Sequence, residues 1–201
     1  FLTGWDVDAV YQTALEMVNN TWGISKTTSE YSRYFSIYPN NIELLGIFVV
    51  CLKVNQYLGV LDTSNGIMMF VIINSSIMVA TEYCLFSVLK SIWNEKWAML
   101  GWMIFIAYIG LSPWVSIPYS DSVGLIFPIL ELKLFLEIKK GKRKWLYSLL
   151  LGIITGVGYL LKPQTSIMFI AVLMWEFLKL LFEKQKIDFN KKLFIGMVVL
   201  C

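Results

Sequence analysis

Two aspartates near the start of the chain, Asp6 and Asp8, are the carboxylates best placed to act on a substrate. They stand two residues apart where a stretch of helical spacing begins, so an N-cap followed by an acid in the first helical turn would also explain them. The chain contains no histidine, and a carboxylate is then the natural general base for deprotonating a hydroxyl acceptor. The spacing alone leaves both interpretations open.

Three other segments combine polar side chains with aromatic or apolar ones. Residues 31–41, YSRYFSIYPNN, suit either an aromatic belt at a membrane interface or the floor of a sugar site, with Arg33 available to a phosphate. Residues 112–122, SPWVSIPYSDS, form a second interfacial loop, in which Asp121 could simply cap the following helix. Near the end of a later apolar run, the Lys162 ammonium could contact lipid headgroups or the phosphate of a lipid-linked substrate.

A chain of 201 residues that is 57% hydrophobic and only 15% charged is typical of a membrane protein. A soluble domain is usually about a quarter charged and less than half apolar. Several segments approach the roughly 20 apolar residues that a helix needs to cross a bilayer. We therefore predict an all-α polytopic membrane protein in contact with membrane lipids, and we exclude a soluble globular fold.

The sequence also excludes several classes of function. Without histidine, neither Ser-His-Asp hydrolysis nor a histidine-ligated metal site can form. The three cysteines form no CxxC pair, and the chain contains no GxxxxGKS/T phosphate loop. We therefore expect no nucleic-acid partner and no ATP-driven activity, and the sequence indicates no particular cofactor.

The hydropathy pattern divides the chain into a polar segment and a series of apolar runs, which together make one partial transmembrane domain over residues 1–201. Residues 1–39 form the polar segment, and within it residues 7–18 have the spacing of a short helix that could lie apolar face down on a membrane. Residues 40–201 hold about six apolar runs and the start of another: 42–61, 67–89, 97–111, 123–138, 145–161, 166–182 and 193 onward. Because the chain starts without Met and ends inside a run, we expect an internal piece of a larger protein.

Basic clusters predict how these runs are oriented. One cluster lies at residues 139–144 and a second at residues 184–192, with two runs between them. Both clusters are therefore expected on the cytoplasmic side, because cytoplasmic loops are enriched in Lys and Arg. The junction at residues 162–164 and the loop at residues 112–122 are then expected outside.

The acidic segment 1–39 also suits the outside, but three runs separate it from the loop at 112–122. Three full crossings would place the two segments on opposite sides of the membrane. One of the runs must then fail to span if the two segments share a side. The run 42–61 is the weakest spanner, because it is interrupted by Lys53, Asn55 and Gln56.

Charged residues inside apolar runs are costly and are functional candidates by default. Glu82, Glu131 and Lys133 lie deepest in their runs. Glu131 and Lys133 are two positions apart and cannot face each other on one helix, so each needs a partner elsewhere. The patch Asn74-Ser75-Ser76 is predicted to form hydrogen bonds between helices rather than a site.

Several short motifs occur in a characteristic order between the runs: Gly4-Trp5-Asp6, Ala14–Met17, Tyr34-Phe35, Tyr38-Pro39-Asn40-Asn41, Ser112-Pro113, Pro118-Tyr119-Ser120-Asp121-Ser122 and Gly158–Gln164. In this order the chain resembles the GT-C superfamily of integral-membrane glycosyltransferases over essentially its whole length. The likeness is greatest to Gram-positive bacterial members, and more distant to protein O-mannosyltransferases and aminoarabinose transferases.

The resemblance implies a transmembrane helix bundle whose first extracytoplasmic loop carries the essential carboxylate on a short surface helix. Asp6 matches that position, and Asp8 ranks second. Members of the superfamily take a sugar from a polyprenyl-phosphate donor and pass it to an acceptor on the extracytoplasmic side, which implies an active site on the outer face of a bacterial plasma membrane. Some members need a divalent metal and others do not, so the resemblance assigns no metal ligand.

The resemblance also implies residues that bind the substrates. The turn Tyr38–Asn41 matches the entry to the second helix, Asp121 falls where some relatives carry a second acid, and Lys162 falls where relatives often have a base for the donor phosphate. The expected substrate-binding set is Arg33, Tyr34, Tyr38, Asn40, Asn41, Tyr119, Asp121, Lys162 and Gln164.

Two other functions are open on the sequence. A non-enzymatic carrier or flippase for lipid-linked sugars or envelope polymers would use Glu82, Glu131 and Lys133 at membrane depth and would leave Asp6 peripheral. A structural subunit of an envelope complex would depend on none of these side chains. Neither the sugar nor the acceptor of a transferase is written in the sequence.

Overall fold

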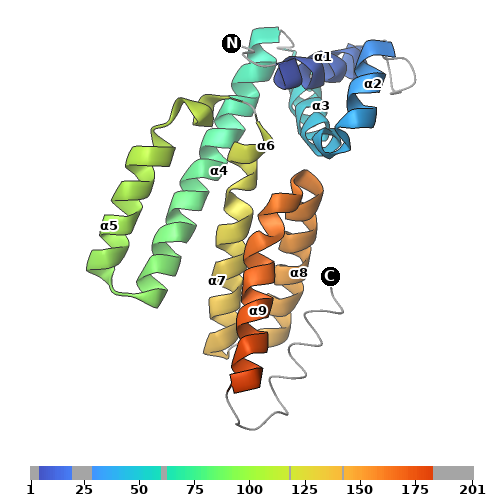
Figure 1. The fold of residues 1–201 in the computed structure, drawn as a ribbon. Coiled ribbons are helices and arrows are strands. Elements are labelled where there is room, and N and C mark those ends of the chain that lie inside the picture. The colour runs from blue at the N-terminus through green and yellow to red at the C-terminus, as the bar shows by residue number, and fades with distance from the viewer. Residues whose placement is uncertain (1–4, 20–28, 60–62, 118, 142, 183–201) are drawn as a thin grey trace. The chain divides into compact units, whose positions relative to one another are not determined.

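The computed structural model describes residues 5–19, 29–59, 63–117, 119–141 and 143–182. Every regular element in these ranges is a helix, which confirms the all-α prediction for this part of the chain (Figure 1). The elements in chain order are α1 (Trp5–Asn19), α2 (Ser29–Ile37), η2 (Pro39–Asn41), α3 (Ile42–Tyr57), α4 (Thr63–Ile92), α5 (Glu95–Phe105), η3 (Ile106–Gly110), η4 (Pro113–Ser116), α6 (Ser120–Gly124), α7 (Ile126–Lys140), α8 (Lys144–Leu161), η5 (Pro163–Ser166) and α9 (Ile167–Phe182).

The helices belong to two compact units. Unit 1 contains Phe1–Val79 and Ala107–Val123, and unit 2 contains Ala80–Ile106 and Gly124–Cys201. Helix α4 contributes its first part to unit 1 and its second part to unit 2. The expected polar segment and the first expected run therefore lie together in unit 1.

In unit 1, helix α1 packs along α3. The buried side chains of α1 recur at the predicted helical spacing and include Val7, Val10, Tyr11, Ala14 and Val18. The Tyr11 ring meets Phe48 of α3 edge-on with ring centroids 5.3 Å apart, and Phe48 stacks on Phe70 of α4 at 4.8 Å. The apolar face of α1 thus lies against protein, which corrects the expectation that this face would lie on the membrane.

In unit 2, helices α7, α8 and α9 share an apolar core. One fully or almost fully buried residue comes from each helix, and three half-buried residues surround them: Ile138, Leu151 and Phe169, with Leu134, Tyr147 and Leu173. Helix α7 ends at Gly141, whose φ of +88° is a left-handed conformation that glycine adopts without strain. The chain can then reverse into α8 and bring the three helices together.

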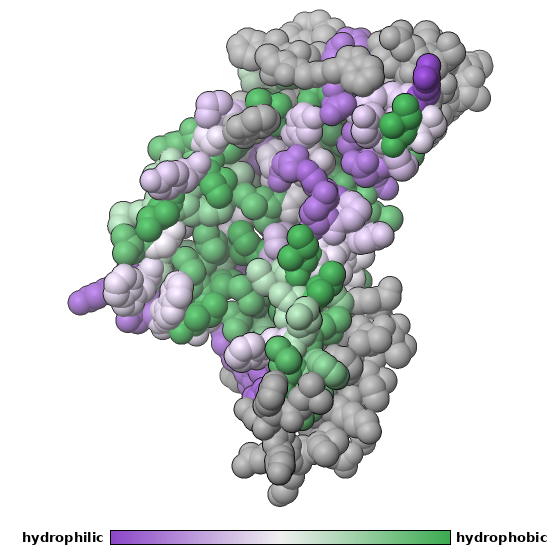
Figure 2. All heavy atoms as spheres, viewed as in Figure 1, coloured by the Kyte–Doolittle hydropathy of each residue, from purple (hydrophilic) through white to green (hydrophobic). Residues whose placement is uncertain are grey.

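Within the described ranges, two helices are long and apolar enough to cross a bilayer: Gly66–Ile92 within α4, and α8. Both fall on predicted runs. Helix α3, which falls on the run predicted to be the weakest spanner, is not one of the two. Figure 2 shows hydrophobic side chains over α5 and the neighbouring part of α4, where the exposed residues of α5 include Met99, Leu100, Met103 and Ile104. Such outward apolar faces fit contact with lipid.

The packing of α8 predicts different outcomes for two of its glycines. A Cβ at Gly158 would lie 2.8 Å from Thr165 Oγ1 and 2.9 Å from Phe127 Cγ, whereas a Cβ at Gly156 would meet nothing within 4 Å. We expect Gly158→Ala to destabilise the protein by about 1–3 kcal/mol through overpacking, measured as the midpoint of thermal unfolding in detergent. The matched control Gly156→Ala should be neutral or stabilising by up to about 1 kcal/mol. Equal midpoints for the two variants would contradict the close approach at Gly158.

Candidate functional site around Asp6

The Asp6 carboxylate lies where three segments of unit 1 meet. Asp6 is partly buried in the first turn of α1, and its Oδ2 accepts a hydrogen bond of 2.8 Å from the hydroxyl of Tyr119. Tyr119 stands just before α6, 113 positions further along the chain. From α2, the hydroxyl of Tyr34 faces the same carboxylate. Two phenols from separate parts of the chain thus converge on the predicted general base.

The turn between α2 and α3 holds Tyr34 in place. The backbone N–H of Tyr38 donates to the Tyr34 carbonyl at 2.9 Å, and the fixed φ of Pro39 suits the start of η2. One turn later the side-chain amide of Asn41 donates to the Tyr34 hydroxyl oxygen, and Asn40 donates to Asn41 Oδ1 at 3.2 Å. The predicted turn Tyr38–Asn41 therefore orients a phenol toward Asp6.

Burial and the Asp6 charge keep both phenols protonated. Burial, then the hydrogen bond and charge of Asp6, and then the charge of Asp121 raise the pKa of Tyr119 to about 12. The pKa of Tyr34 is also raised: burial is the main cause, the hydrogen bond from Asn41 opposes it, and the charge of Asp6 adds to it. Both hydroxyls are therefore donors at neutral pH, and the Asp6 carboxylate is their acceptor.

A buried amide fixes the segment that carries Tyr119. Asn74 of α4 is 1% exposed, and its side-chain amide donates to the carbonyl of Val115 in η4. The Tyr119 N–H donates to the Ile117 carbonyl at 2.8 Å, and the Ser122 hydroxyl donates to the Tyr119 carbonyl at 3.0 Å. Asn74 thus bonds between elements, as predicted, and it acts on the segment that positions Tyr119.

Three other predicted residues of unit 1 have looser surroundings. Asp8 Oδ1 accepts a hydrogen bond of 3.2 Å from the Gln12 side chain, so Asp8 is engaged along its own helix. The Arg33 side chain is exposed on α2, and no carboxylate in the described part of the chain forms an ion pair with it. Asp121 is exposed in the first turn of α6. Only Asp6 therefore combines partial burial with convergent donors.

Aromatic rings lie beside this centre. The ring of Tyr34 meets Phe35 edge-on at 5.1 Å and lies tilted against Tyr38 at 5.2 Å between centroids. Tyr34 and Phe35 are buried, whereas Tyr38 is 42% exposed. The exposed ring could stack against the apolar face of a sugar, which agrees with the floor considered for residues 31–41.

Lys162 and Gln164 stand at the junction of α8 and α9. The Lys162 N–H donates to the Gly158 carbonyl at 2.8 Å, and its own carbonyl accepts a hydrogen bond of 2.9 Å from the Thr165 hydroxyl. Gln164 is exposed in η5. These two residues belong to unit 2, whereas the other nine predicted site residues belong to unit 1.

The structure gives Tyr34 and Tyr119 a role that the sequence did not indicate. Both were expected to bind substrate, which stays a prediction, and both also donate toward Asp6. No periodic pattern links positions so far apart, and only their places in the ordered motifs pointed to them. Across the described ranges, no group of three or more Cys, Asp or Glu side chains is arranged to hold a metal ion.

A second buried carboxyl lies in unit 2. Glu131 of α7 is fully buried, and the Thr155 side chain of α8 and the Phe169 backbone of α9 face it. Within the described part of the chain, neither Glu131 oxygen nor Thr155 Oγ1 completes a hydrogen bond. Lys133 contacts α4 instead, with its Nζ 3.9 Å from Cys84 Sγ. Glu131 and Lys133 thus face different helices, as their spacing predicts.

Comparison with known proteins adds one finding to this geometry. The whole chain, residues 1–201, matches the model of a family described as a conserved hypothetical integral membrane protein. The chain belongs to this family. Neither the curated proteins nor the solved structures gave a match. Membership confirms an integral membrane protein in contact with lipid, and the activity has to be argued from the site.

The raised pKa of Tyr119 predicts a pH-dependent contribution to stability. Tyr119→Phe removes the hydrogen bond to Asp6 and should cost about 1 kcal/mol near neutral pH. Because the folded state holds the proton to a pH of about 12 and the unfolded state releases it near 10.0, this contribution should stay constant below the lower value and shrink as pH rises through the window. Denaturant unfolding of both proteins from pH 7 to pH 11 measures the difference.

The exposed Tyr108 supplies the control for this experiment, since its side chain is 81% exposed. Tyr108→Phe should follow the wild-type protein at every pH. Tyr34 is present in all three proteins, but the charge of Tyr119 helps to raise the Tyr34 pKa, so the difference reports the two neighbouring phenols together. A wild-type minus Tyr119→Phe difference that stays constant up to pH 11 would contradict the proposed protonated donor.

Proposed function

We propose that this protein is a membrane glycosyltransferase that moves a sugar from a polyprenyl-phosphate donor to an acceptor hydroxyl on the extracytoplasmic side. The observation that carries the proposal is the Asp6 carboxylate with its two convergent phenols. A general base has to be held in one orientation and still be accessible to its substrate. Asp6 is oriented by Tyr119 and is only partly buried, so it meets both conditions.

In the proposed reaction, Asp6 takes the proton from the acceptor hydroxyl. The acceptor oxygen attacks the anomeric carbon, the bond from that carbon to the donor phosphate oxygen breaks, and polyprenyl phosphate leaves with the electron pair. The leaving group is already activated, so the protein mainly supplies geometry, a base and positive charge for the departing phosphate. Tyr34 and Tyr119 position the carboxylate and do not themselves touch the substrate in this scheme.

Arg33 is the cation of unit 1 best suited to the donor phosphate. It lies on α2, one position before Tyr34, and its guanidinium is exposed. A guanidinium presents paired donors that match a phosphate. Lys162 in unit 2 was expected to take this role from the resemblance, and that role stays a prediction.

The helix arrangement supports a common side for the two loops. Helix α3 packs on α1 within unit 1 and does not have the length and hydropathy of a span. If α4 crosses the membrane and α5 with η3 returns, the segments before α4 and after η3 share one side; α5 alone, at 11 residues, is also shorter than a span. That topology would resolve the conflict among the three runs, and it is the one we propose, with the Asp6 loop outside.

The first experiment replaces each aspartate of α1 in the intact protein. We expect Asp6→Asn to reduce transfer at least about 100-fold, because it removes the base and keeps the size of the side chain. The control Asp8→Asn should reduce transfer less than about tenfold, because Asp8 contacts only Gln12 of its own helix among the described residues. Mass spectrometry of polyprenyl-phosphate lipids from host membranes measures the accumulated donor.

A deletion strain calibrates this measurement. Equal accumulation of a polyprenyl-phosphate sugar in the deletion and in Asp6→Asn supports the transferase and identifies the class of sugar. Accumulation in the deletion alone would remove Asp6 from the mechanism. Accumulation in neither strain would exclude a polyprenyl-phosphate donor. Membrane levels and unfolding midpoints of the variants show whether each one has folded.

A carrier for lipid-linked sugars is the second candidate function, and the buried Glu131 favours it. An ionisable side chain inside a membrane helix bundle, without a hydrogen-bond partner among the described residues, is a typical feature of transport pathways. If the protein is a transferase, Glu131→Gln should lower stability at most and leave donor consumption within about twofold. Loss of function in Glu131→Gln with retention in Asp6→Asn, in the same lipid assay, would favour the carrier.

A further inference from the structure

Two helix turns at one end of unit 2 carry most of its described positive charge. The turn from α4 to α5 holds Lys90 and Lys96, and the turn from α7 to α8 holds Lys139, Lys140, Arg143 and Lys144. Figure 1 shows both turns at the same end of these helices. We call these six side chains the basic rim. Cations from segments far apart in the sequence are thus gathered at one end of unit 2.

Three cations of the basic rim are engaged by carboxylates. Lys90 pairs with Glu95 at 3.0 Å, and Lys140 pairs with Glu137 at 2.6 Å. The Lys139 ammonium lies 2.8 Å from Glu176, a buried residue of α9. The described carboxylates at this end are therefore already in ion pairs with lysines of the rim. The remaining cations leave the rim with an excess of positive charge.

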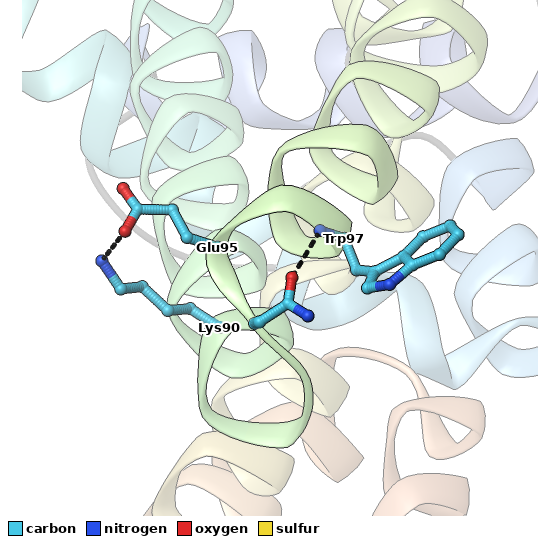
Figure 3. Close-up of polar contacts among 4 residues, drawn as sticks. Lys90, Glu95 and Trp97 are labelled. Carbon is cyan, nitrogen blue, oxygen red and sulfur yellow. Dashed lines mark hydrogen bonds and ion pairs between the residues drawn. The ribbon is translucent and has the colours of Figure 1, made fainter.

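Lys96 and Arg143 contribute to this excess positive charge at the surface. Both side chains are exposed, and neither forms an ion pair with another residue in the described ranges. Arg143 has a φ of 48°, which places it at the bend between α7 and α8. Figure 3 shows the ion pair of Lys90 and Glu95, which links the two ends of the turn between α4 and α5.

Exposed tryptophans lie at the same level as the basic rim. Trp93 and Trp97 flank the α4–α5 turn, Trp145 follows the α7–α8 turn, and Trp175 precedes Glu176 on α9. Their exposed fractions are 62%, 59%, 74% and 62%. Figure 3 shows Asn94 capping α5 through the Trp97 backbone N–H, while the indole extends away from the turn. Tryptophan is enriched at the level of lipid headgroups, because its ring is apolar and its N–H is a donor.

We infer that the basic rim binds the headgroups of anionic phospholipids in the cytoplasmic leaflet. The occupant is argued from charge and composition: an excess of cations suits phosphate, and exposed indoles near the same helix ends suit the depth where headgroups and acyl chains meet. Lipids without net charge could interact with the indoles but would not balance the positive charge of the cations. The inference does not depend on the proposed glycosyl transfer.

The ion pairs determine which residues carry the binding. Lys139 has a buried carboxylate as its partner, so its ammonium is already neutralised inside the unit. Lys96 and Arg143 have no such partner in the described ranges and can turn to a phosphate without breaking a contact. The rim is thus divided into cations that hold helices together and cations that meet lipid.

The test is native mass spectrometry of the intact protein, titrated with phosphatidylglycerol or with phosphatidylcholine of the same acyl chains. The variants are Lys96→Gln, Arg143→Asn and the double variant; Asn tolerates the positive φ at residue 143. The control Lys53→Gln removes one charge from α3 in unit 1, where the ammonium only donates to Gln56 at 3.3 Å.

We expect the wild-type protein to prefer phosphatidylglycerol. Each rim variant should weaken that affinity about fivefold and the double variant roughly twentyfold, because a surface cation near an anionic headgroup contributes about that factor. Lys53→Gln should change it less than about twofold, and binding of phosphatidylcholine should be the same in all variants, which reports that they are folded.

Three outcomes would overturn the inference. The first is equal affinity of the wild-type protein for both lipids, which would leave the rim to another acidic partner such as a protein segment. The second is a double variant that keeps the wild-type preference. The third is a loss in Lys53→Gln as large as that in the double variant, which would mean that total charge, and not the rim, attracts the lipid.

Discussion

The hydrogen bond from Tyr119 to Asp6 is the contact on which the arrangement of unit 1 depends, because it joins positions 113 residues apart. A carboxylate that leaves water among aromatic rings needs donors to replace its hydration. Tyr119 supplies one donor, and Tyr34 faces the same group while accepting from Asn41. Satisfying one partly buried charge thus fixes α2, its following turn and the segment before α6 around the first turn of α1.

Unit 2 meets the same requirement for one buried acid, Glu176, and leaves a second, Glu131, without a completed hydrogen bond among the described residues. At the basic rim, Lys139 and the buried Glu176 neutralise each other between α7 and α9. In the interior, Glu131 lies against Thr155 without a completed hydrogen bond in the described part of the chain, although both side chains are buried. Polar groups placed near helix ends find partners or water, whereas those in the middle must be matched by neighbouring helices. The cost of Glu131 makes its presence a feature that function or assembly has to explain.

Local periodicity explains what the sequence could predict. The spacing of Val7, Val10 and Val18 predicted α1 to within two residues at its start, and the apolar runs matched α4 and α8. The face that α1 turns to α3 was predicted, but its partner was not, because lipid and protein cover an apolar stripe equally well on sequence evidence. The contact between Tyr119 and Asp6 lies beyond any local rule, since it depends on how α4 and α5 return the chain to the same place. The close approach at Gly158 is likewise set by Phe127 and Thr165 of other elements.

Accessibility and orientation distinguish the three carboxylates compared as possible bases, which are Asp6, Asp8 and Glu131. Glu131 is held inside a helix core, where an acceptor hydroxyl would have to displace packed side chains before it could lose a proton. Asp8 is accessible, yet its described partner is a single amide on its own helix, so nothing from another segment fixes it against a substrate. Asp6 is accessible and is also oriented from across the fold by Tyr119. A base has to keep one geometry through the transfer of a proton, and that requirement favours α1 over α7 as the place of the proposed reaction.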